Sequence, residues 1–271
     1  MLVKQQHCLS SFTWMLLPVL AFVASGTKGK SGSLDDSDSK ARPDLAHVKK
    51  HIVALSNRFR QQDGRGQIKE DPKLSKAAQA FAEFMARTDE FNHTADGKEP
   101  AERVADAGYR YCIVAENIAN ESRESGFTTD ELATRIVEGW KKSPPHRKNL
   151  LDADVLDIGV GLAQSSKSGK YYAVQDFGRP KSKEIKIQIT NRTDATVSYT
   201  LEGKSFSIEP RYTLTHRLCR PSELKFEWPS AGGPAAKFQP KNGSYYAISK
   251  DDAGKYRVDE SVKAPKDSGK K

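Results

Sequence analysis

Residues 139–151 read GWKKSPPHRKNLL, and this stretch is the most informative one for the architecture of the first half of the chain. Trp140 completes an apolar helical stripe, so a helix should bury this face and end at the two lysines that follow. Ser143 can cap a new helix, and two prolines then occupy early positions whose N–H groups have no helical partner. His146 therefore stands in the first turn of a short helix, where the positive helix end favours the neutral imidazole.

The segments before and after this stretch predict an α+β domain over residues 45–180. Asp44 and Asp71 can each cap a helix, a third helix should open at Pro100, and Thr128 resembles the start of a capping box. Three apolar stripes recur at helical spacing: Leu45, Val48, Ile52, Leu55 and Phe59; Leu74, Ala78, Phe81 and Met85; and Leu132, Ile136 and Trp140. Residues 157–162 and 171–177 then predict two strands, so this part is rich in helices first and ends in strands.

The pattern changes after Pro180 to short alternating runs separated by Gly, Pro, Asn or Asp. Strands at this spacing predict a small all-β, sandwich-like domain over residues 182–258. This segment has no cluster of catalytic side chains, and its lone His216 is expected to be structural. Residues 259–271 are expected to form a disordered basic tail.

The amino end resembles a secretory signal peptide. Lys4 precedes the apolar run FTWMLLPVLAFVA at residues 12–24, which is shorter than the ~20 residues that a membrane-spanning helix needs. We expect a signal peptide over residues 1–26 and a flexible linker over residues 27–44, with an uncleaved anchor as the alternative. If the signal peptide is cleaved, we expect the mature protein to be secreted or periplasmic, without a transmembrane helix.

Export would determine which cysteines remain in the mature protein and whether they can form a disulfide. Cys8 would leave with the signal peptide, whereas Cys112 and Cys219 would stay in a compartment that permits disulfides. The two could form a bridge, or they could be unrelated buried thiols. The sequence leaves both alternatives open.

The chain of 271 residues carries 44 Lys and Arg against 35 Asp and Glu, a net charge of +9. Residues 181–271 hold 18 basic and 11 acidic side chains, so most of the excess lies in the last third. Such a region suits an anionic cell-wall or surface polymer, and an ordinary solvated lysine surface is the simpler explanation. A membrane surface or a nucleic acid would also suit a basic region, but we do not expect a nucleic-acid partner.

Two further motifs precede the 139–151 stretch: FNHTADG at residues 91–97 and AENIA at residues 115–119. In this order, and with PAERVADAGY at 100–109 and YYAVQDFG at 171–178, the set resembles the CAP superfamily of cysteine-rich secretory, antigen 5 and pathogenesis-related proteins. The bacterial SCP-like extracellular branch is the most similar. The resemblance implies an α-β-α sandwich with a cleft.

The resemblance also implies the site residues. His93 and His146 match the two cleft histidines of the family and Glu116 matches one of its two glutamates, while Asn117 and Ser143 would support the cleft. Ser143 stands where the family usually has the second glutamate, and Ala115 stands where it usually has a glycine. Two imidazoles and one carboxylate suit a divalent metal, zinc foremost, with Glu116 either as a ligand or as a group that orients a histidine.

Two functions follow from this set. One is a non-enzymatic domain that binds a small apolar ligand, a peptide or a glycan in the cleft. The alternative is a metal-assisted hydrolase, such as a peptidase, in which Glu116 or His146 activates water. The sequence contains neither HExxH nor GxSxG. A nucleophilic pair of Cys112 with a cleft histidine is a further variant, but Cys112 lies in an apolar run and is expected to be buried.

Overall fold

The structure is a computed structural model that describes residues 42–229 and 235–262. The expected signal peptide, most of the expected linker and the tail from residue 263 onward lie outside these residues. In the described part of the chain, no helix combines the length and the apolar character that crossing a bilayer requires.

Five helices surround the first sheet, and their caps follow the sequence closely. Asp44 and Asp71 accept hydrogen bonds from the first turns of α1 and α2, and Thr128 and Glu131 form the predicted capping box of α4. Ser143 stands at the N-cap of α5, but its hydroxyl makes no capping bond, contrary to the prediction. The helices are α1 (Leu45–Gln62), α2 (Pro72–Thr88), α3 (Pro100–Asp106), α4 (Thr129–Lys142) and α5 (Pro144–Leu150).

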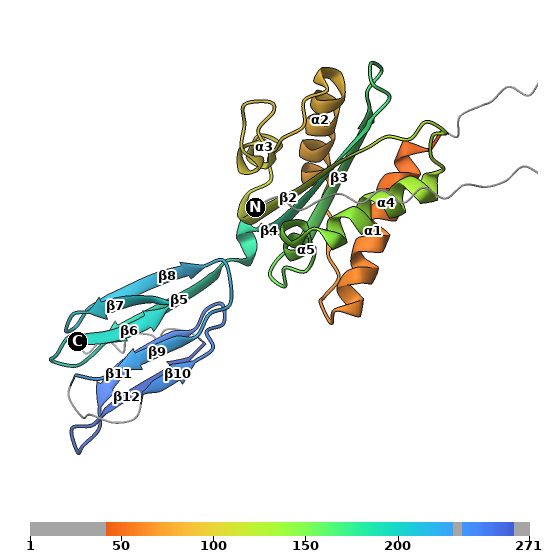
Figure 1. The fold of residues 1–271 in the computed structure, drawn as a ribbon. Coiled ribbons are helices and arrows are strands. Elements are labelled where there is room, and N and C mark those ends of the chain that lie inside the picture. Colours follow the sequence, from red (N-terminus) through yellow and green to blue (C-terminus); the bar gives the residue numbers. More distant parts are fainter. Residues whose placement is uncertain (1–41, 230–234, 263–271) are drawn as a thin grey trace, which may run out of the picture. The chain divides into compact units, whose positions relative to one another are not determined.

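The first sheet has the strand order β1-β3-β4-β2. Its strands are β1 (Lys69–Glu70), β2 (Tyr111–Glu121), β3 (Asp157–Gln164) and β4 (Tyr171–Pro180). In Figure 1, α1, α4 and α5 cover one face of this sheet, and α2 and α3 cover the other. The result is the α-β-α sandwich that the family resemblance implied, with β2 at one edge.

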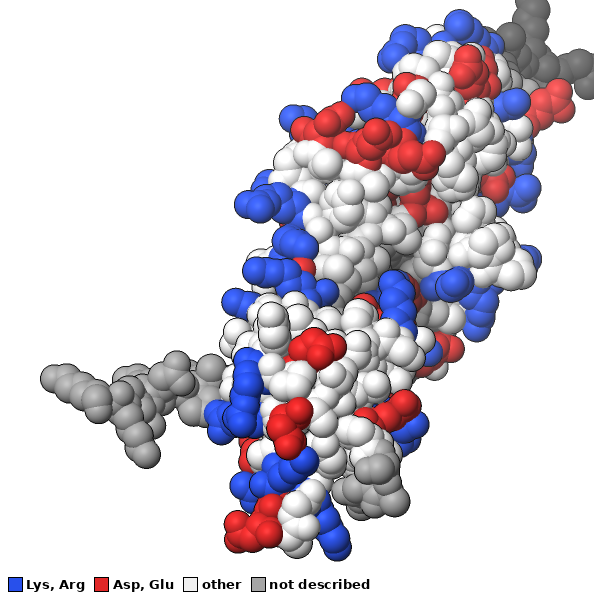
Figure 2. Space-filling view, turned by 90° about the vertical axis from the view of Figure 1, so that its left-hand side faces the viewer, with Lys and Arg blue, Asp and Glu red and all other residues white. Residues whose placement is uncertain are grey.

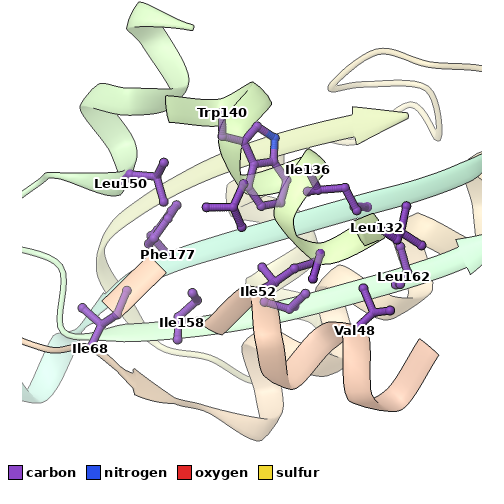
Figure 3. Packing of buried hydrophobic residues seen from close by; sticks show 14 of the residues in the cluster. Val48, Ile52, Ile68, Leu132, Ile136, Trp140, Leu150, Ile158, Leu162 and Phe177 are labelled. Carbon is purple, nitrogen blue, oxygen red and sulfur yellow. The ribbon is translucent and has the colours of Figure 1, made fainter. Parts of the chain in front are cut away.

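The larger core lies between the sheet and the α1–α4 layer (Figure 3). Alternating residues of β3 and β4 point to this layer and pack against the apolar stripes of the two helices. The labelled side chains are Val48, Ile52, Ile68, Leu132, Ile136, Trp140, Leu150, Ile158, Leu162 and Phe177. The indole N–H of Trp140 donates to the carbonyl of Ile118, so the largest core side chain also fixes α4 to the edge strand.

Helix α2 packs unusually close to the opposite face of β3. A Cβ on Gly159 would lie 2.2 Å from the carbonyl carbon of Leu74, and one on Gly161 would lie 2.1 Å from the carbonyl oxygen of Ala78. Real Cβ contacts are essentially never this short, so the two layers can approach this closely only where the strand has no side chain.

The C-terminal region from residue 185 is all-β, as predicted. One of its sheets has the order β10-β9-β6-β7 and the other β12-β11-β5-β8. Their inward side chains form one cluster that includes Ile187, Tyr199, Phe226 and Tyr246. The strands are β5 (Ile185–Asn191), β6 (Val197–Leu201), β7 (Lys204–Ile208), β8 (Thr213–Leu218), β9 (Leu224–Glu227), β10 (Ala236–Phe238), β11 (Tyr245–Lys250) and β12 (Tyr256–Ser261), with the short 3-10 helix η1 (Lys181–Lys183) before β5.

Several elements were not predicted from the sequence. The AENIA motif within β2 gives a candidate site residue but was not recognised as part of a strand. Strands β1 and β10 are too short to show an alternating pattern. Strand β12 runs to Ser261, so the expected disorder does not begin at residue 259. Its residues pair with β11 over their whole length, which holds them in the sheet although they alternate weakly.

His216 is structural, as expected. Its Nε2 lies 2.7 Å from the hydroxyl of Tyr199, and its ring packs edge-on against Phe206. Burial lowers the pKa of the His216 imidazole, which keeps the ring neutral within the sandwich.

The positive charge of the C-terminal region is largely compensated. Residues 185–262 hold 12 basic and 9 acidic side chains, so the excess is three, whereas the nine residues that follow add four lysines and one aspartate. Half of those 12 cations lie within 4.0 Å of a carboxylate, Lys250 with Asp194 for example. On the face that Figure 2 shows, basic and acidic side chains alternate over this lower part of the molecule.

The two cysteines whose pairing was left open form a disulfide. Cys112 and Cys219 are 107 residues apart in sequence, with 5.3 Å between their Cα atoms. Cys112 stands at a register shift between β2 and β4, an irregularity of the kind that redirects a side chain. The adjacent Arg220 pairs with Asp152 and Asp154 of the first domain. Since its sulfur is bonded, Cys112 is not a free nucleophile.

We expect two glycine substitutions to change stability in opposite directions. Gly161→Ala should lower the free energy of unfolding by about 1–3 kcal/mol or more, because the new methyl group overlaps the backbone of α2. Gly139→Ala, inside α4 and with no atom within 4 Å of the new Cβ, should raise it by about 0.5–1 kcal/mol. Urea unfolding of both variants tests this, and a neutral Gly161→Ala would contradict the close packing of α2.

We also expect the disulfide to stabilise the protein. The double variant Cys112→Ser and Cys219→Ser should unfold at a lower temperature, with a loss of at most about 4–5 kcal/mol for a loop of this length. Calorimetry with and without a reducing agent measures the effect, and reduction should not affect the double variant. An unchanged wild-type midpoint after complete reduction would show that the bridge contributes nothing.

Candidate functional site

His93 lies in the loop between α2 and α3, and short local hydrogen bonds shape this loop. The side chain of Asn92 accepts from the backbone N–H and the hydroxyl of Thr94, and Gly97 N–H donates to the Thr94 carbonyl. The ring of Phe91 contacts that of Tyr172 on β4, which fixes the start of the loop to the sheet. The His93 side chain remains 48% exposed, so solvent reaches the ring.

Glu116 on β2 orients the His93 ring. Its Oε1 lies 2.7 Å from His93 Nδ1, and its side chain is only 1% exposed. In the neutral ring, a carboxylate at Nδ1 favours the tautomer with the proton on that nitrogen, and Nε2 then carries the lone pair that can bind a metal or accept a proton.

Arg103 on α3 holds both partners in place. Its Nη2 donates to Glu116 Oε2 at 2.7 Å and to the His93 carbonyl at 2.9 Å, and its Nη1 donates to Asp96 and to the Lys98 carbonyl. The guanidinium also stacks 3.6 Å above the ring of Phe81. One buried side chain therefore ties the His93 loop, the edge strand and α2 together.

His146 comes from the opposite layer, on α5. Its carbonyl accepts from the side chain of Asn117, and the Asn149 side chain donates to the carbonyl of Glu116 and to Asn117. Burial and the neighbouring His93 both lower the pKa of the His146 imidazole. The two histidines are thus close enough to interact electrostatically, and each lies beside the edge strand β2.

Asp176 is a further buried acid beside this cluster. It is the partner of Glu116 in the register of β2 and β4, and its Oδ1 has no hydrogen-bond partner among the described residues. Burial raises the pKa of Asp176 well above its ordinary value, and Glu116 raises it further.

The structure brings most of the predicted site residues together. His93 contacts Glu116, and Asn117 contacts the backbone of His146, whereas Ser143 lies at the junction of α4 and α5 without a capping role. The sequence analysis did not single out Arg103 or Asp176. Arg103 lies within the run at 100–109 that supports the family resemblance, but nothing local distinguishes it from a surface arginine, because its partners are 5 to 13 residues away.

Both oxygens of Glu116 are engaged, which changes the expected metal site. Among the described residues, no group of three or more His, Cys, Asp or Glu side chains is arranged to hold a metal ion. Of the two roles considered for Glu116, its hydrogen bonds favour orientation of His93 over direct ligation.

Comparison with known proteins agrees with this architecture. Residues 53–177 match the family model described as the cysteine-rich secretory protein family, CAP. This segment of the chain is a CAP domain. The matched residues include His93, Glu116 and His146.

The alignments with individual relatives cover only part of this chain, and some cover only part of the relative. The uncharacterized protein YkwD of Bacillus subtilis (strain 168) is 30% identical over 145 residues, which are 53% of this chain and 52% of YkwD. The chain thus spans about half the length of this curated relative. An outer surface protein of Borrelia burgdorferi aligns over 51% of this chain and 96% of its own, with 20% identity and a TM-score of 0.45. An extracellular protein with an SCP domain from Bacillus anthracis aligns over 49% of this chain and 41% of its own, with 23% identity and a TM-score of 0.42.

We expect Arg103 to be essential for the stability of this cluster. Arg103→Met should lower the free energy of unfolding by about 3–5 kcal/mol, because it leaves the Glu116 carboxylate buried without its cation. The double variant Arg103→Met and Glu116→Leu should regain part of this loss, because no buried charge remains. The exposed Arg58→Met on α1 serves as the matched control.

Urea unfolding of the four proteins measures these differences. If Arg103→Met unfolds at the same urea concentration as Arg58→Met, the buried ion pair does not hold the site together.

Proposed function

We propose that this protein is an exported CAP-domain protein that binds a small apolar ligand, a peptide or a glycan beside His93 and His146, with zinc bound by these two histidines. The observation that supports it best is the hydrogen-bonded series His93–Glu116–Arg103. It fixes the orientation of an exposed imidazole, which a histidine with no role in binding does not require.

The residues fit a zinc site in which the protein supplies only two ligands. Nε2 of His93 and the imidazole of His146 would be the protein ligands, and Glu116 would orient His93 without touching the metal. Neutral imidazole is the form that binds metal, and the lowered pKa of His146 favours it. Zinc bound in this way would leave positions open to water or to a ligand and could polarise a bound carbonyl group.

The hydrolase alternative receives less support from the geometry. A general base needs a free lone pair within reach of the attacking water. Glu116 already accepts from His93 with one oxygen and from Arg103 with the other, and its side chain is 1% exposed. A role in binding therefore agrees better with the contacts of Glu116 than a role in activating water.

Two features of the chain support export, a disulfide and an apolar run near the amino end. The disulfide between Cys112 and Cys219 is typical of oxidising compartments, and the apolar run at residues 12–24 is typical of a signal peptide. An anionic surface polymer is a better partner for the basic tail from residue 263 than for residues 185–262, where ion pairs compensate half of the cations.

Zinc titration tests the proposal directly. We expect saturable binding to the full mature protein in calorimetry, with affinity lowered by more than roughly tenfold in His93→Ala and in His146→Ala, and by about 10–100-fold in Glu116→Gln. His51→Ala, an exposed histidine that pairs with Asp130, is the matched control and should bind zinc like the wild type.

Two outcomes would contradict the proposal. Equal affinity in wild type, His93→Ala and His146→Ala would place the metal elsewhere. Loss of binding in His51→Ala would assign it to the histidines of α1.

A further inference from the structure

A pocket of about 870 Å³ lies at one end of the first sheet, between the loop after β2 and the hairpin that joins β3 to β4. Tyr171 at the start of β4 pairs with Glu121 at the end of β2 and with Gln164 at the end of β3, so both loops leave the sheet beside it. The volume is within the range for small-molecule sites. Neither His93 nor His146 lines this pocket, which is therefore separate from the proposed zinc site. We call it the hairpin pocket.

Local hydrogen bonds fix both walls of the hairpin pocket. In the hairpin, the hydroxyl of Ser165 accepts from the backbone N–H groups of Lys167 and Ser168. In the loop after β2, the Arg123 side chain donates to the carbonyl of Gly126. The walls are thus largely formed before a ligand arrives, which reduces the conformational entropy that binding costs.

Tyr171 supplies a buried hydroxyl to the hairpin pocket. The residue is 5% exposed and its ring packs edge-on against Phe127, yet its hydroxyl has no hydrogen-bond partner within residues 42–229 and 235–262. In that part of the chain, only Arg103 Nε and Asp176 Oδ1 are both unpartnered and fully enclosed, so the Tyr171 oxygen is open to the pocket that the residue lines. A buried tyrosine hydroxyl usually has a partner, and a ligand oxygen would provide one here.

The charges that line the pocket are of both signs. Arg123 is compensated by Glu131 at 2.8 Å, whereas Arg42 and Glu124 have no opposite charge within 4.0 Å among the described residues. Burial raises the pKa of the Tyr171 hydroxyl and the nearby Arg42 lowers it, so the hydroxyl stays protonated and can donate. One unpaired charge of each sign gives no net charge, which favours a neutral ligand over an ion.

Uncharged polar side chains also line the hairpin pocket. Ser122 and Ser166 make no side-chain hydrogen bond to any described residue. Gln164 donates through its amide N–H to the carbonyl of Gly169, which leaves its side-chain oxygen as an acceptor. Since a hydroxyl both donates and accepts, a ligand with several hydroxyl groups can pair with this lining, whereas a hydrocarbon would leave it unsatisfied.

We propose that the hairpin pocket binds a neutral saccharide of one or two sugar units, with one sugar oxygen accepting the hydrogen bond of Tyr171. Other sugar hydroxyls donate to Glu124 and accept from Arg42. A zwitterionic peptide is the competing ligand, because it would pair with these two charges but leave Ser122 and Ser166 without partners. The pocket needs no metal, so failure of zinc binding would leave this site intact.

Titration of the full mature protein with cellobiose, N,N′-diacetylchitobiose and glycylglycine, followed by NMR of the backbone amides, tests this inference. At least one of the two disaccharides should bind saturably and shift amides of residues 121–127 and 164–171. Glycylglycine, which has both charges but no hydroxyl group, should bind roughly tenfold more weakly or worse.

Two variants with matched controls locate the binding. Tyr171→Phe removes only the hydroxyl, and it should weaken the disaccharide roughly tenfold without lowering the free energy of unfolding, since no described residue bonds to that hydroxyl. Tyr212→Phe, at an exposed tyrosine of the β region, should change neither quantity. Ser166→Trp should block the pocket, whereas Lys167→Trp, at the next position of the hairpin but outside the lining, should leave binding unchanged. Tyr171→Phe decides the question if Ser166→Trp does not fold.

Four results would overturn the inference. The first is the absence of saturable binding for both disaccharides, and the second is an affinity for glycylglycine that equals or exceeds theirs. The third is unchanged disaccharide affinity in Tyr171→Phe. The fourth is disaccharide binding that persists in folded Ser166→Trp but is lost in His93→Ala, which would assign the saccharide to the proposed zinc site.

Discussion

The buried ion pair between Arg103 and Glu116 is the interaction on which the arrangement of the site depends. Two charges that are 6% and 1% exposed lose their hydration, and only mutual pairing with additional hydrogen bonds compensates for that loss. Arg103 supplies these bonds by also binding the carbonyl of His93 and the carboxylate of Asp96. The pair therefore joins the loop that carries His93 to the edge strand, and Glu116 in turn fixes the orientation of the imidazole.

The layered fold explains why the two histidines lie near each other although they belong to opposite layers. Strand β2 is at an edge of the sheet, so elements from either face can reach around it. The loop after α2 brings His93 from one side, and α5, whose Asn149 bonds to the carbonyl of Glu116, brings His146 from the other. An interior strand would separate the two layers, because neighbouring strands would occupy both of its sides.

The sequence predicts those parts of the fold that depend on local patterns. The caps at Asp44, Asp71 and Thr128 require only neighbouring residues, and all three were identified. Strand β12 and the disulfide were not determined in this way, because pairing with β11 and the approach of Cys112 to Cys219 depend on residues far along the chain. For the site, the family motifs identified His93 and Glu116, but Arg103 becomes recognisable only when the burial of its partners is known.

The net charge of a sequence segment also does not predict how its charges pair in the structure. The sequence placed the positive excess in the last third, which suggested a basic surface on the β region. Ion pairs such as Lys250 with Asp194 compensate much of it, whereas Lys76 and Arg87 on α2 have no such carboxylate in the described residues. The electric field that a ligand meets depends on which charges remain unpaired, because a cation beside a carboxylate acts at distance as a dipole. The net charge of a region in the sequence therefore does not by itself locate the surface that attracts an anion.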